Sequence, residues 1–150
     1  MATARGRELL TPDQRLEIMQ IPEDDWALGT YYTFSNQDLK IINKRRREEN
    51  RLGFAVQLAV LRFPGWSYTH TKAISEKVVN YIAGQLEANP DAFSQYPQRE
   101  NTLWDHLKDI RSEYGFVNFT IAEYRSTYKH LLQLALENGD PKHLLQECLA

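Results

Sequence analysis

The sequence has a single cysteine, Cys148, so no disulfide can form within the chain, and a reducing cytoplasm is the expected compartment. It also has no long hydrophobic run. The longest apolar stretch, Leu52–Leu61, is interrupted by Gln57. Because a membrane span needs roughly 18 apolar residues, this stretch predicts a buried helix. The opening residues, MATARGRELL, contain no apolar signal-peptide core. These absences predict a cytoplasmic protein with no membrane partner.

Motifs for catalysis and metal binding are also missing. The histidines have neither metal-ligand spacing nor cysteine pairs beside them, so we expect surface or helix-capping positions for His70, His106, His130 and His143. The chain has no phosphate-cradling glycine loop and no nucleophile elbow. We therefore expect no enzymatic activity, cofactor, metal or small-molecule substrate in this chain.

Positive charge does not dominate the chain overall, but it is concentrated in one place. The net charge of the 150 residues is -2, which argues against a general nucleic-acid binder. The segment Lys40–Arg51 nevertheless carries six cations and two anions, and it includes the run Lys44–Arg47. The remainder of the chain is therefore acidic. A charge distribution of this kind focuses an electrostatic field on one face of the molecule.

Most of the secondary-structure signals in the sequence favour helices. Capping patterns at Thr11, Ser35 and Thr120 each place a polar residue three positions after the cap. Further helices are expected over Phe54–Arg62, Ser75–Leu86, Arg99–Tyr114, Thr120–Asn138 and from His143 onward. The first of these is apolar on most of its circumference and belongs in the middle of a fold. The sequence predicts an all-α fold class: a compact multi-helix domain, or two small helical ones sharing a core.

The cations are expected on the helix that starts after Ser35, with a break at Asn50–Gly53. At about 100° per residue, four of them share a narrow stripe: Lys40, Lys44, Arg47 and Arg51. Arg45 lies to one side, and Arg46 falls on the apolar side. The stripe has three interpretations that the residues alone leave open. It is a solvated face with intrahelical pairs (Arg45–Glu49 and Lys44–Glu48), a contact for a phosphate backbone, or a contact for an acidic protein.

Aromatic residues form a second signal. Several lie near cations such as Arg62, and both tyrosine hydroxyls and arginine side chains are common phosphate contacts. The set comprises Tyr31, Tyr32, Trp66, Tyr68, Tyr96 and Trp104. Because aromatic side chains in all-α domains more often fill the core, we expect most of these residues to be structural.

Two long strings carry a family resemblance. NKRRREENRLGFAVQLAVLRFPGW (Asn43–Trp66) and YPQRENTLWDHLKDIRSEYGF (Tyr96–Phe116), together with RGRELLTPDQR (Arg5–Arg15), resemble the N-terminal region of transposases of the replicative class II transposons, the Tn-three family. The resemblance covers essentially the whole chain. It is carried mainly by the basic segment followed by LGFAVQL and LRFPG.

The resemblance implies a specific function, whereas the residues alone are compatible with several. Members are large cytoplasmic bacterial proteins whose N-terminal part recognises the terminal inverted repeats of the transposon through helix-turn-helix-like DNA-binding modules. Strand cleavage and transfer use a Mg²⁺-dependent DDE site in an RNase-H-like domain farther along the chain. The expected partners are double-stranded DNA, the remainder of the transposase and a second transposase copy.

The expected DNA contacts fall on two segments. The basic segment and the end of the apolar helix supply backbone contacts: Lys40, Lys44, Arg45, Arg47, Arg51 and Arg62. A second polar helix supplies candidates for base contacts, because Asn and Arg make bidentate bonds to base edges: Arg99, Asn101, Thr102, Lys108 and Arg111. A packed amphipathic helix with an ordinary charged face is the alternative for this second helix.

The organisation of the chain is predicted as residues 1–150 of a longer protein, since the segment Leu144–Ala150 is an apolar run with no stop signal. An echo between Arg47–Phe54 and Arg111–Phe116, each ending in Gly-Phe, suggests two sub-modules, about 1–66 and 67–150. The alternative function is a protein-protein docking or dimerisation module of the transposase with only non-specific DNA contact.

Overall fold

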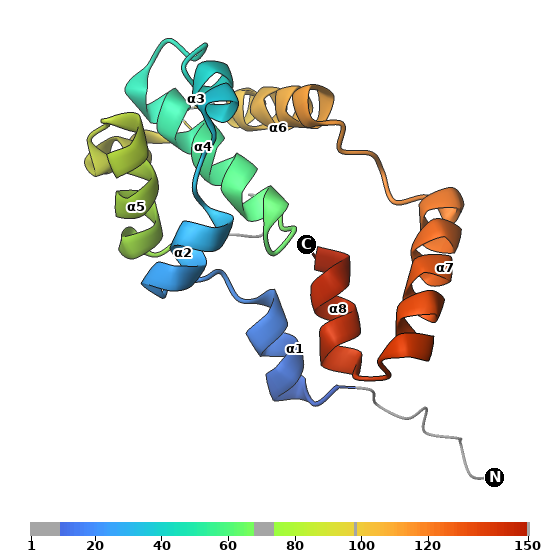
Figure 1. Ribbon diagram of the computed structural model, residues 1–150. Helices are drawn as coiled ribbons and strands as arrows, with labels where there is room; N and C mark the ends of the chain where they lie inside the picture. The colour runs from blue at the N-terminus through green and yellow to red at the C-terminus, as the bar shows by residue number, and fades with distance from the viewer. Residues whose placement is uncertain (1–9, 68–73, 98, 150) are drawn as a thin grey trace, which may run out of the picture. The chain divides into compact units, whose positions relative to one another are not determined.

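The structure is a computed structural model that describes residues 10–67, 74–97 and 99–149. In chain order the elements are α1 (Pro12–Met19), α2 (Asp25–Tyr31), α3 (Asn36–Ile42), α4 (Glu48–Arg62), α5 (Glu76–Leu86), the 3₁₀ helix η2 (Pro90–Gln95), α6 (Glu100–Tyr114), α7 (Ile121–Glu137) and α8 (Pro141–Leu149) (Figure 1). No strand occurs among these described residues. The predicted all-α fold class is confirmed.

The chain separates into two units. One unit, here called the terminal unit, comprises Met1–Gln20 and Asn118–Ala150 and contains α1, α7 and α8. The other, the central unit, comprises Ile21–Val117 and contains the remaining elements. A functional division of the chain near residue 66 stays a prediction.

The predicted capping boxes start three helices. At α1 the Thr11 hydroxyl accepts a hydrogen bond from the backbone N–H of Gln14, whose side chain accepts one from the backbone N–H of Thr11. The same reciprocal pair forms between Ser35 and Asp38 at α3 and between Thr120 and Glu123 at α7. Each pair satisfies two donors that a helix start leaves without a partner.

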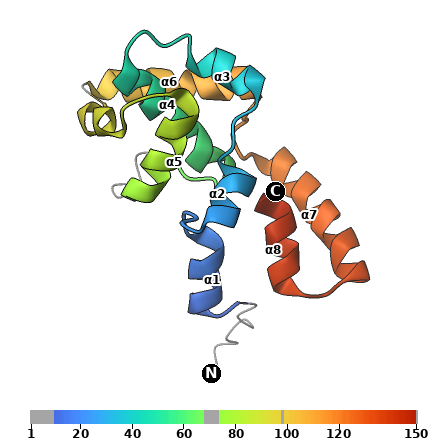
Figure 2. The same ribbon diagram turned by 60° about the vertical axis from the view of Figure 1, so that its left-hand side comes forward.

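The core of the central unit is built around α4. Every residue from Leu52 to Val60 is buried, and α3, α5, η2 and α6 pack around this helix (Figure 2). The prediction of an apolar helix in the middle of the fold is confirmed. At about 25 cal/mol per Å² of apolar surface, this burial is the main stabilising contribution available to the unit.

The predicted break at Asn50–Gly53 is wrong, because α4 begins at Glu48 and continues through Gly53. The glycine has a packing role instead, since a side chain there would overlap with the ring of Tyr96. Gly115, by contrast, ends α6 with a φ of 70°, a left-handed conformation that favours glycine. The two Gly-Phe stretches therefore have different local structures.

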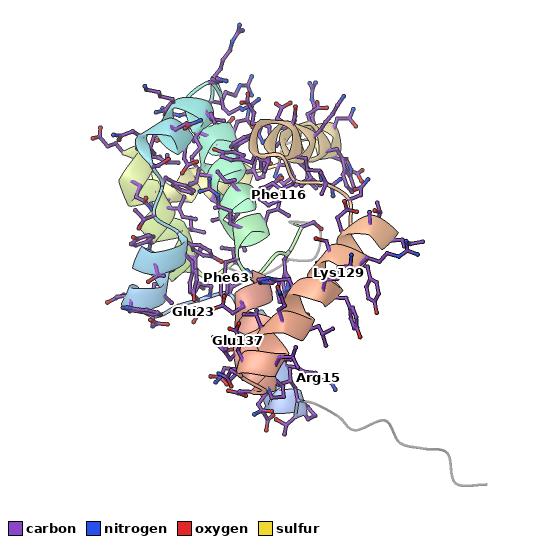
Figure 3. All side chains as sticks on the ribbon, turned by 45° about the vertical axis from the view of Figure 1, so that its right-hand side comes forward. Arg15, Glu23, Phe63, Phe116, Lys129 and Glu137 are labelled. Atoms are coloured by element: carbon purple, nitrogen blue, oxygen red, sulfur yellow. The ribbon has the colours of Figure 1, made fainter. Side chains whose placement is uncertain are left out.

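The terminal unit is small. Its α8 packs against both α1 and α7, and Lys142 of α8 forms an ion pair of 3.0 Å with Glu17 of α1. The helix α7 has no buried residue along its length, with Lys129 at its middle and Glu137 at its C-terminal end (Figure 3). This helix therefore contributes little to a hydrophobic core within its own unit.

Candidate nucleic-acid interface

The run of cations lies in a loop and not on a helix, which corrects the prediction of a basic helix. The helix α3 ends at Ile42, where the backbone N–H groups of Lys44 and Arg45 donate to the carbonyls of Ile41 and Ile42. These i to i-3 bonds tighten the helix end. The chain has to turn here because α3 packs on α4. A continuous helix could not fold back on itself in this way.

The predicted stripe therefore does not exist as one helix face. Lys40 lies on α3, Lys44 and Arg47 lie in the loop of residues 43–47, and Arg51 lies on α4. Lys40, Lys44 and Arg47 are exposed, whereas Arg51 is half-buried. We call residues 43–47 the basic loop. It still gathers positive charge on one part of the central unit, but from a loop between two helices.

Two ion pairs hold the basic loop beside α6. The Nζ atom of Lys44 lies 3.1 Å from a carboxylate oxygen of Glu113, and Nη1 of Arg45 lies 2.7 Å from one of Asp109. The prediction paired these two cations with Glu48 and Glu49 on the same helix, but in the structure their partners are Glu113 and Asp109 on α6. Once the segment is a loop, its side chains reach across to the neighbouring helix.

The inward and outward cations are exchanged relative to the prediction. Arg45 is the inward residue: its guanidinium lies 4.5 Å from the centre of the Phe54 ring, and its side chain is 20% exposed. Arg46 is exposed. The prediction for Arg46 assumed helical geometry, so it failed together with the helix.

Arg62 is held in a polar cluster between helices. Its guanidinium donates to both carboxylate oxygens of Asp38, at 2.7 and 3.1 Å, and lies 4.8 Å from the centre of the Tyr114 ring. The hydroxyls of Tyr114 and Ser35 also donate to Asp38. Burial alone would raise the pKa of Asp38, but these hydrogen bonds lower it to about 2. In the absence of DNA, Arg62 therefore links α4 to α3 through its hydrogen bonds with Asp38.

The helix α6 has one buried and one exposed face. The buried side consists of Leu103, His106, Leu107 and Ile110. The exposed side carries most of the predicted base-contact residues, namely Arg99 at the N-cap and Asn101, Lys108 and Arg111 on the helix, whereas Thr102 is half-buried. Whether any of these residues contacts DNA stays a prediction.

Trp104 is a further candidate for a DNA contact, although it belongs to the group of aromatic residues that we expected to be mostly structural. It lies on the polar face of α6 and is 49% exposed. Tyr32 and Tyr96 are buried as expected, and Tyr68 lies outside the described residues. The spacing Asn101, Trp104 and Lys108 (i, i+3, i+7) is the signal that could have placed Trp104 on the outer face.

A buried polar network fixes α6 against α4. Nε2 of Gln57 donates to the hydroxyl oxygen of Tyr96 at 2.6 Å, and the Tyr96 hydroxyl lies 2.9 Å from Nδ1 of His106. Burial, with the nearby charge of Arg45, lowers the pKa of His106 to about 4, so the imidazole is neutral near pH 7. The predicted surface position is wrong for His106, because its ring completes this network between the two helices.

No helix in the described ranges is long and apolar enough to span a membrane. Within the same ranges, no group of three acidic, histidine or cysteine residues is placed to hold a metal ion. The geometry is that of a helical scaffold that presents a basic loop beside the polar face of one helix.

Comparison with protein families places this scaffold in a known class. A family described as a domain of unknown function (DUF4158) matches residues 9–150, so the chain belongs to that family.

Among individual relatives, the transposase for transposon Tn1546 of Enterococcus faecium is 69% identical over 149 residues, which cover 99% of this chain and 15% of the relative. The transposase for transposon Tn501 of Pseudomonas aeruginosa is 33% identical over 86% of this chain and 13% of its own length. The transposase for transposon gamma-delta of Escherichia coli (strain K12) is 33% identical, over 83% of this chain and 13% of its own length. The predicted resemblance to such transposases is confirmed, and the chain spans about 15% of the length of these relatives or less.

Proposed function

We propose that this chain is the N-terminal DNA-binding part of a replicative transposase and that it binds the terminal inverted repeats of its transposon in a sequence-specific way. The observation that carries the proposal is the basic loop held beside the polar face of α6 by the pairs Lys44–Glu113 and Arg45–Asp109. The names of the relatives support the link to DNA transposition. Strand transfer belongs, in this proposal, to a Mg²⁺-dependent DDE domain outside this chain, in a cytoplasmic protein that pairs two transposon ends.

Electrostatics favours the basic loop as the phosphate contact. Lys40, Arg46 and Arg47 have exposed side chains, and the side chain of Lys44 is 59% exposed despite its ion pair with Glu113. Because exposed ion pairs contribute at most about 1 kcal/mol, a DNA phosphate can replace the Glu113 carboxylate as the partner of Lys44. Each phosphate contact should release condensed counterions and make binding depend on salt.

The test is fluorescence anisotropy of the 150-residue chain with two labelled duplexes between about 50 and 200 mM salt. One duplex carries a terminal repeat of transposon Tn1546, the transposon of a relative that is 69% identical. The other is a scrambled duplex of the same composition. We expect the terminal repeat to bind about tenfold more tightly or better. Equal binding of both duplexes, or no binding at the lowest salt, contradicts the proposal.

A matched pair of variants tests the loop. Arg46→Ala should reduce the slope of log affinity against log salt by about 0.9 for both duplexes. Lys129→Ala removes an exposed cation from α7 in the terminal unit and should leave the slope unchanged. An unchanged slope for Arg46→Ala would contradict the assignment of the basic loop to the DNA interface.

A second candidate function is protein docking, and a specific observation favours it. One face of α7 carries exposed apolar and aromatic side chains that are 50–82% exposed: Ile121, Tyr124, Tyr128, Leu132 and Leu136. Their spacing places them on one stripe of the helix. Exposed apolar patches of this kind are typical of protein interfaces. The segment Leu144–Ala150, which prompted this hypothesis, has mostly undescribed side chains.

Sedimentation velocity separates the docking function from DNA binding. Docking to a second copy predicts concentration-dependent dimers, and docking to the rest of the transposase predicts a complex with that part supplied as a separate polypeptide. Tyr128→Glu should abolish either association, and Lys129→Gln, one residue further along α7, should not. A chain that remains monomeric and binds no other part of the transposase contradicts docking.

A further inference from the structure

The outer face of α6 is a continuous surface of mixed chemistry. At about 100° per residue, most of the exposed side chains of α6 fall within about 120° of arc: Asn101, Trp104, Asp105, Lys108, Arg111 and Ser112. The exposed Glu100 and Glu113 lie outside this arc. The face combines an amide, an indole, a carboxylate and a lysine along the first two helical turns. This combination provides hydrogen-bond donors, hydrogen-bond acceptors and an apolar ring close together.

The two flanks of this face differ from the face itself. On one flank, Asp109 and Glu113 hold the basic loop through Arg45 and Lys44. At the opposite edge of the face, Arg111 borders a surface groove of about 500 Å³ whose remaining lining residues are Leu61, Gly65, Trp66 and Ser67. Cations of the basic loop therefore lie along one side of the α6 face, and Arg111 lies at its opposite edge.

Between Asn101 and Lys108 the α6 face carries one anion and one cation, because Asp105 lies one residue beyond Trp104 and offsets Lys108. A carboxylate at this position repels phosphates, but it can accept a hydrogen bond from the amino group of cytosine. The face is therefore suited to the floor of a DNA groove, and the loop beside it is suited to the sugar-phosphate backbone. The α6 face would therefore contact the bases, and the basic loop would contact the sugar-phosphate backbone.

We propose that α6 enters the major groove, with Asn101, Trp104 and Lys108 against base edges and the basic loop on the adjacent backbone. The inference rests on the DNA-binding function proposed above and names the element that reads sequence. An α-helix is about 10–12 Å across with its side chains, and the major groove is about 12 Å wide. Asn101 offers a bidentate pair to adenine, Lys108 donates to guanine, and the Trp104 ring packs on thymine methyl groups.

The interior of the unit supports this role for α6. The network of Gln57, Tyr96 and His106 fixes the rotation of α6 about its own axis, because His106 lies on the buried side. The same rotation directs Asn101 and Lys108 outward. A helix held in one rotation presents a defined row of side chains, which base reading requires.

The experiment is a selection from a duplex library with a randomised centre, bound by the parent 150-residue chain and by Asn101→Ala, Trp104→Ala and Lys108→Ala. We expect the parent to enrich one motif and each variant to lose preference at one or two of its base positions. The loss should be about 5- to 150-fold per position, with the salt slope nearly unchanged. Arg46→Ala is the matched control, and it should weaken all sequences alike without changing the motif.

The outcomes distinguish this inference from the function on which it rests. If the parent enriches a motif and all three variants enrich the same motif with the same preference, α6 does not read the bases, while the DNA-binding function stands. If the parent enriches nothing, the sequence-specific function itself fails. Circular dichroism and thermal melts check folding. Asn101 and Lys108 are exposed, so their variants test the inference even if Trp104→Ala is destabilised.

Discussion

The ring of Tyr96 lies directly on Gly53, in the middle of the buried helix α4. The Tyr96 hydroxyl then reaches Gln57, one turn further along the same helix, and His106 on α6. One aromatic side chain thus occupies a notch that only glycine leaves open and joins the two helices. The contact links the core of the central unit to the position of the candidate recognition helix.

Gly53→Ala should destabilise the protein. Alanine favours a helix by about 1 kcal/mol over glycine, but its methyl group would overlap with the Tyr96 ring, which belongs to a buried network. Overpacking of this kind costs about 1–3 kcal/mol. We expect a lower urea midpoint, measured by tryptophan fluorescence.

Gly84→Ala is the matched control for this substitution. Gly84 lies in α5, is exposed, and has no neighbouring atoms within reach of an added methyl group. This change should raise the free energy of unfolding by about 0.5–1 kcal/mol. A Gly53→Ala protein as stable as Gly84→Ala would show that Tyr96 does not occupy the notch.

His106 should make stability fall as the pH is lowered from 6.5 towards 4. Its pKa is about 4 in the folded protein against 6.5 when unperturbed, so between these values the unfolded chain binds the extra proton. The His106 contribution is fully present above pH 6.5 and is lost as the pH falls. By pH 4 the free energy of unfolding should have fallen by about 3 kcal/mol. Urea unfolding at a series of pH values measures this loss.

His106→Asn should flatten this pH dependence, because the titrating imidazole is removed. The matched control is His130→Asn, on the exposed side of α7. Equal slopes for His106→Asn and the parent protein between pH 6.5 and 4.5 would contradict the role assigned to His106.

Asp38→Asn should be strongly destabilising. The carboxylate accepts hydrogen bonds from Arg62, Tyr114 and Ser35, and its loss leaves the Arg62 guanidinium without its counter-charge. Breaking a fully buried pair costs about 3–5 kcal/mol. Since the Arg62 side chain is 31% exposed, we expect about 2–4 kcal/mol. Thermal melts or urea unfolding give the value.

Asp25→Asn provides the comparison for Asp38→Asn. Asp25 pairs with Lys77 at 2.9 Å, but its side chain is 92% exposed. Such a pair contributes at most about 1 kcal/mol. If the two substitutions cost the same, the cluster around Asp38 does not hold α3, α4 and α6 together.

Substitution of Arg45 should mainly lower stability, whereas substitution of Arg46 should mainly change the salt dependence of DNA binding. Arg45→Ala removes the pair with Asp109 and the contact with the Phe54 ring, so it should cost about 1–2 kcal/mol of stability. Arg46→Ala removes an exposed side chain and should leave stability within about 0.5 kcal/mol. Urea unfolding and the salt dependence of DNA binding measure both effects. A flattened salt slope in Arg45→Ala with no loss of stability would reverse the assignment.

Much of the secondary structure could be predicted because its signals are local. Thr11, Ser35 and Thr120 cap helices through side chains within three residues, and Gly115 ends α6 through its own backbone conformation. The candidate site was harder to predict. Lys44 and Arg45 take partners on α6, more than sixty residues away, and no helical periodicity reveals such a contact.

The all-helical class, the capped helix starts, the apolar helix at the centre and the segment where positive charge gathers could all be predicted from the sequence. These follow from backbone hydrogen bonding, hydrophobic periodicity and composition, which act over a few residues. The helix through Gly53, the inward position of Arg45 and the outward position of Arg46 depend instead on tertiary packing. The reason is physical: Tyr96, Asp109 and Phe54 lie far away or on other elements, and the packing of α3 on α4 forces the chain to turn at the basic loop.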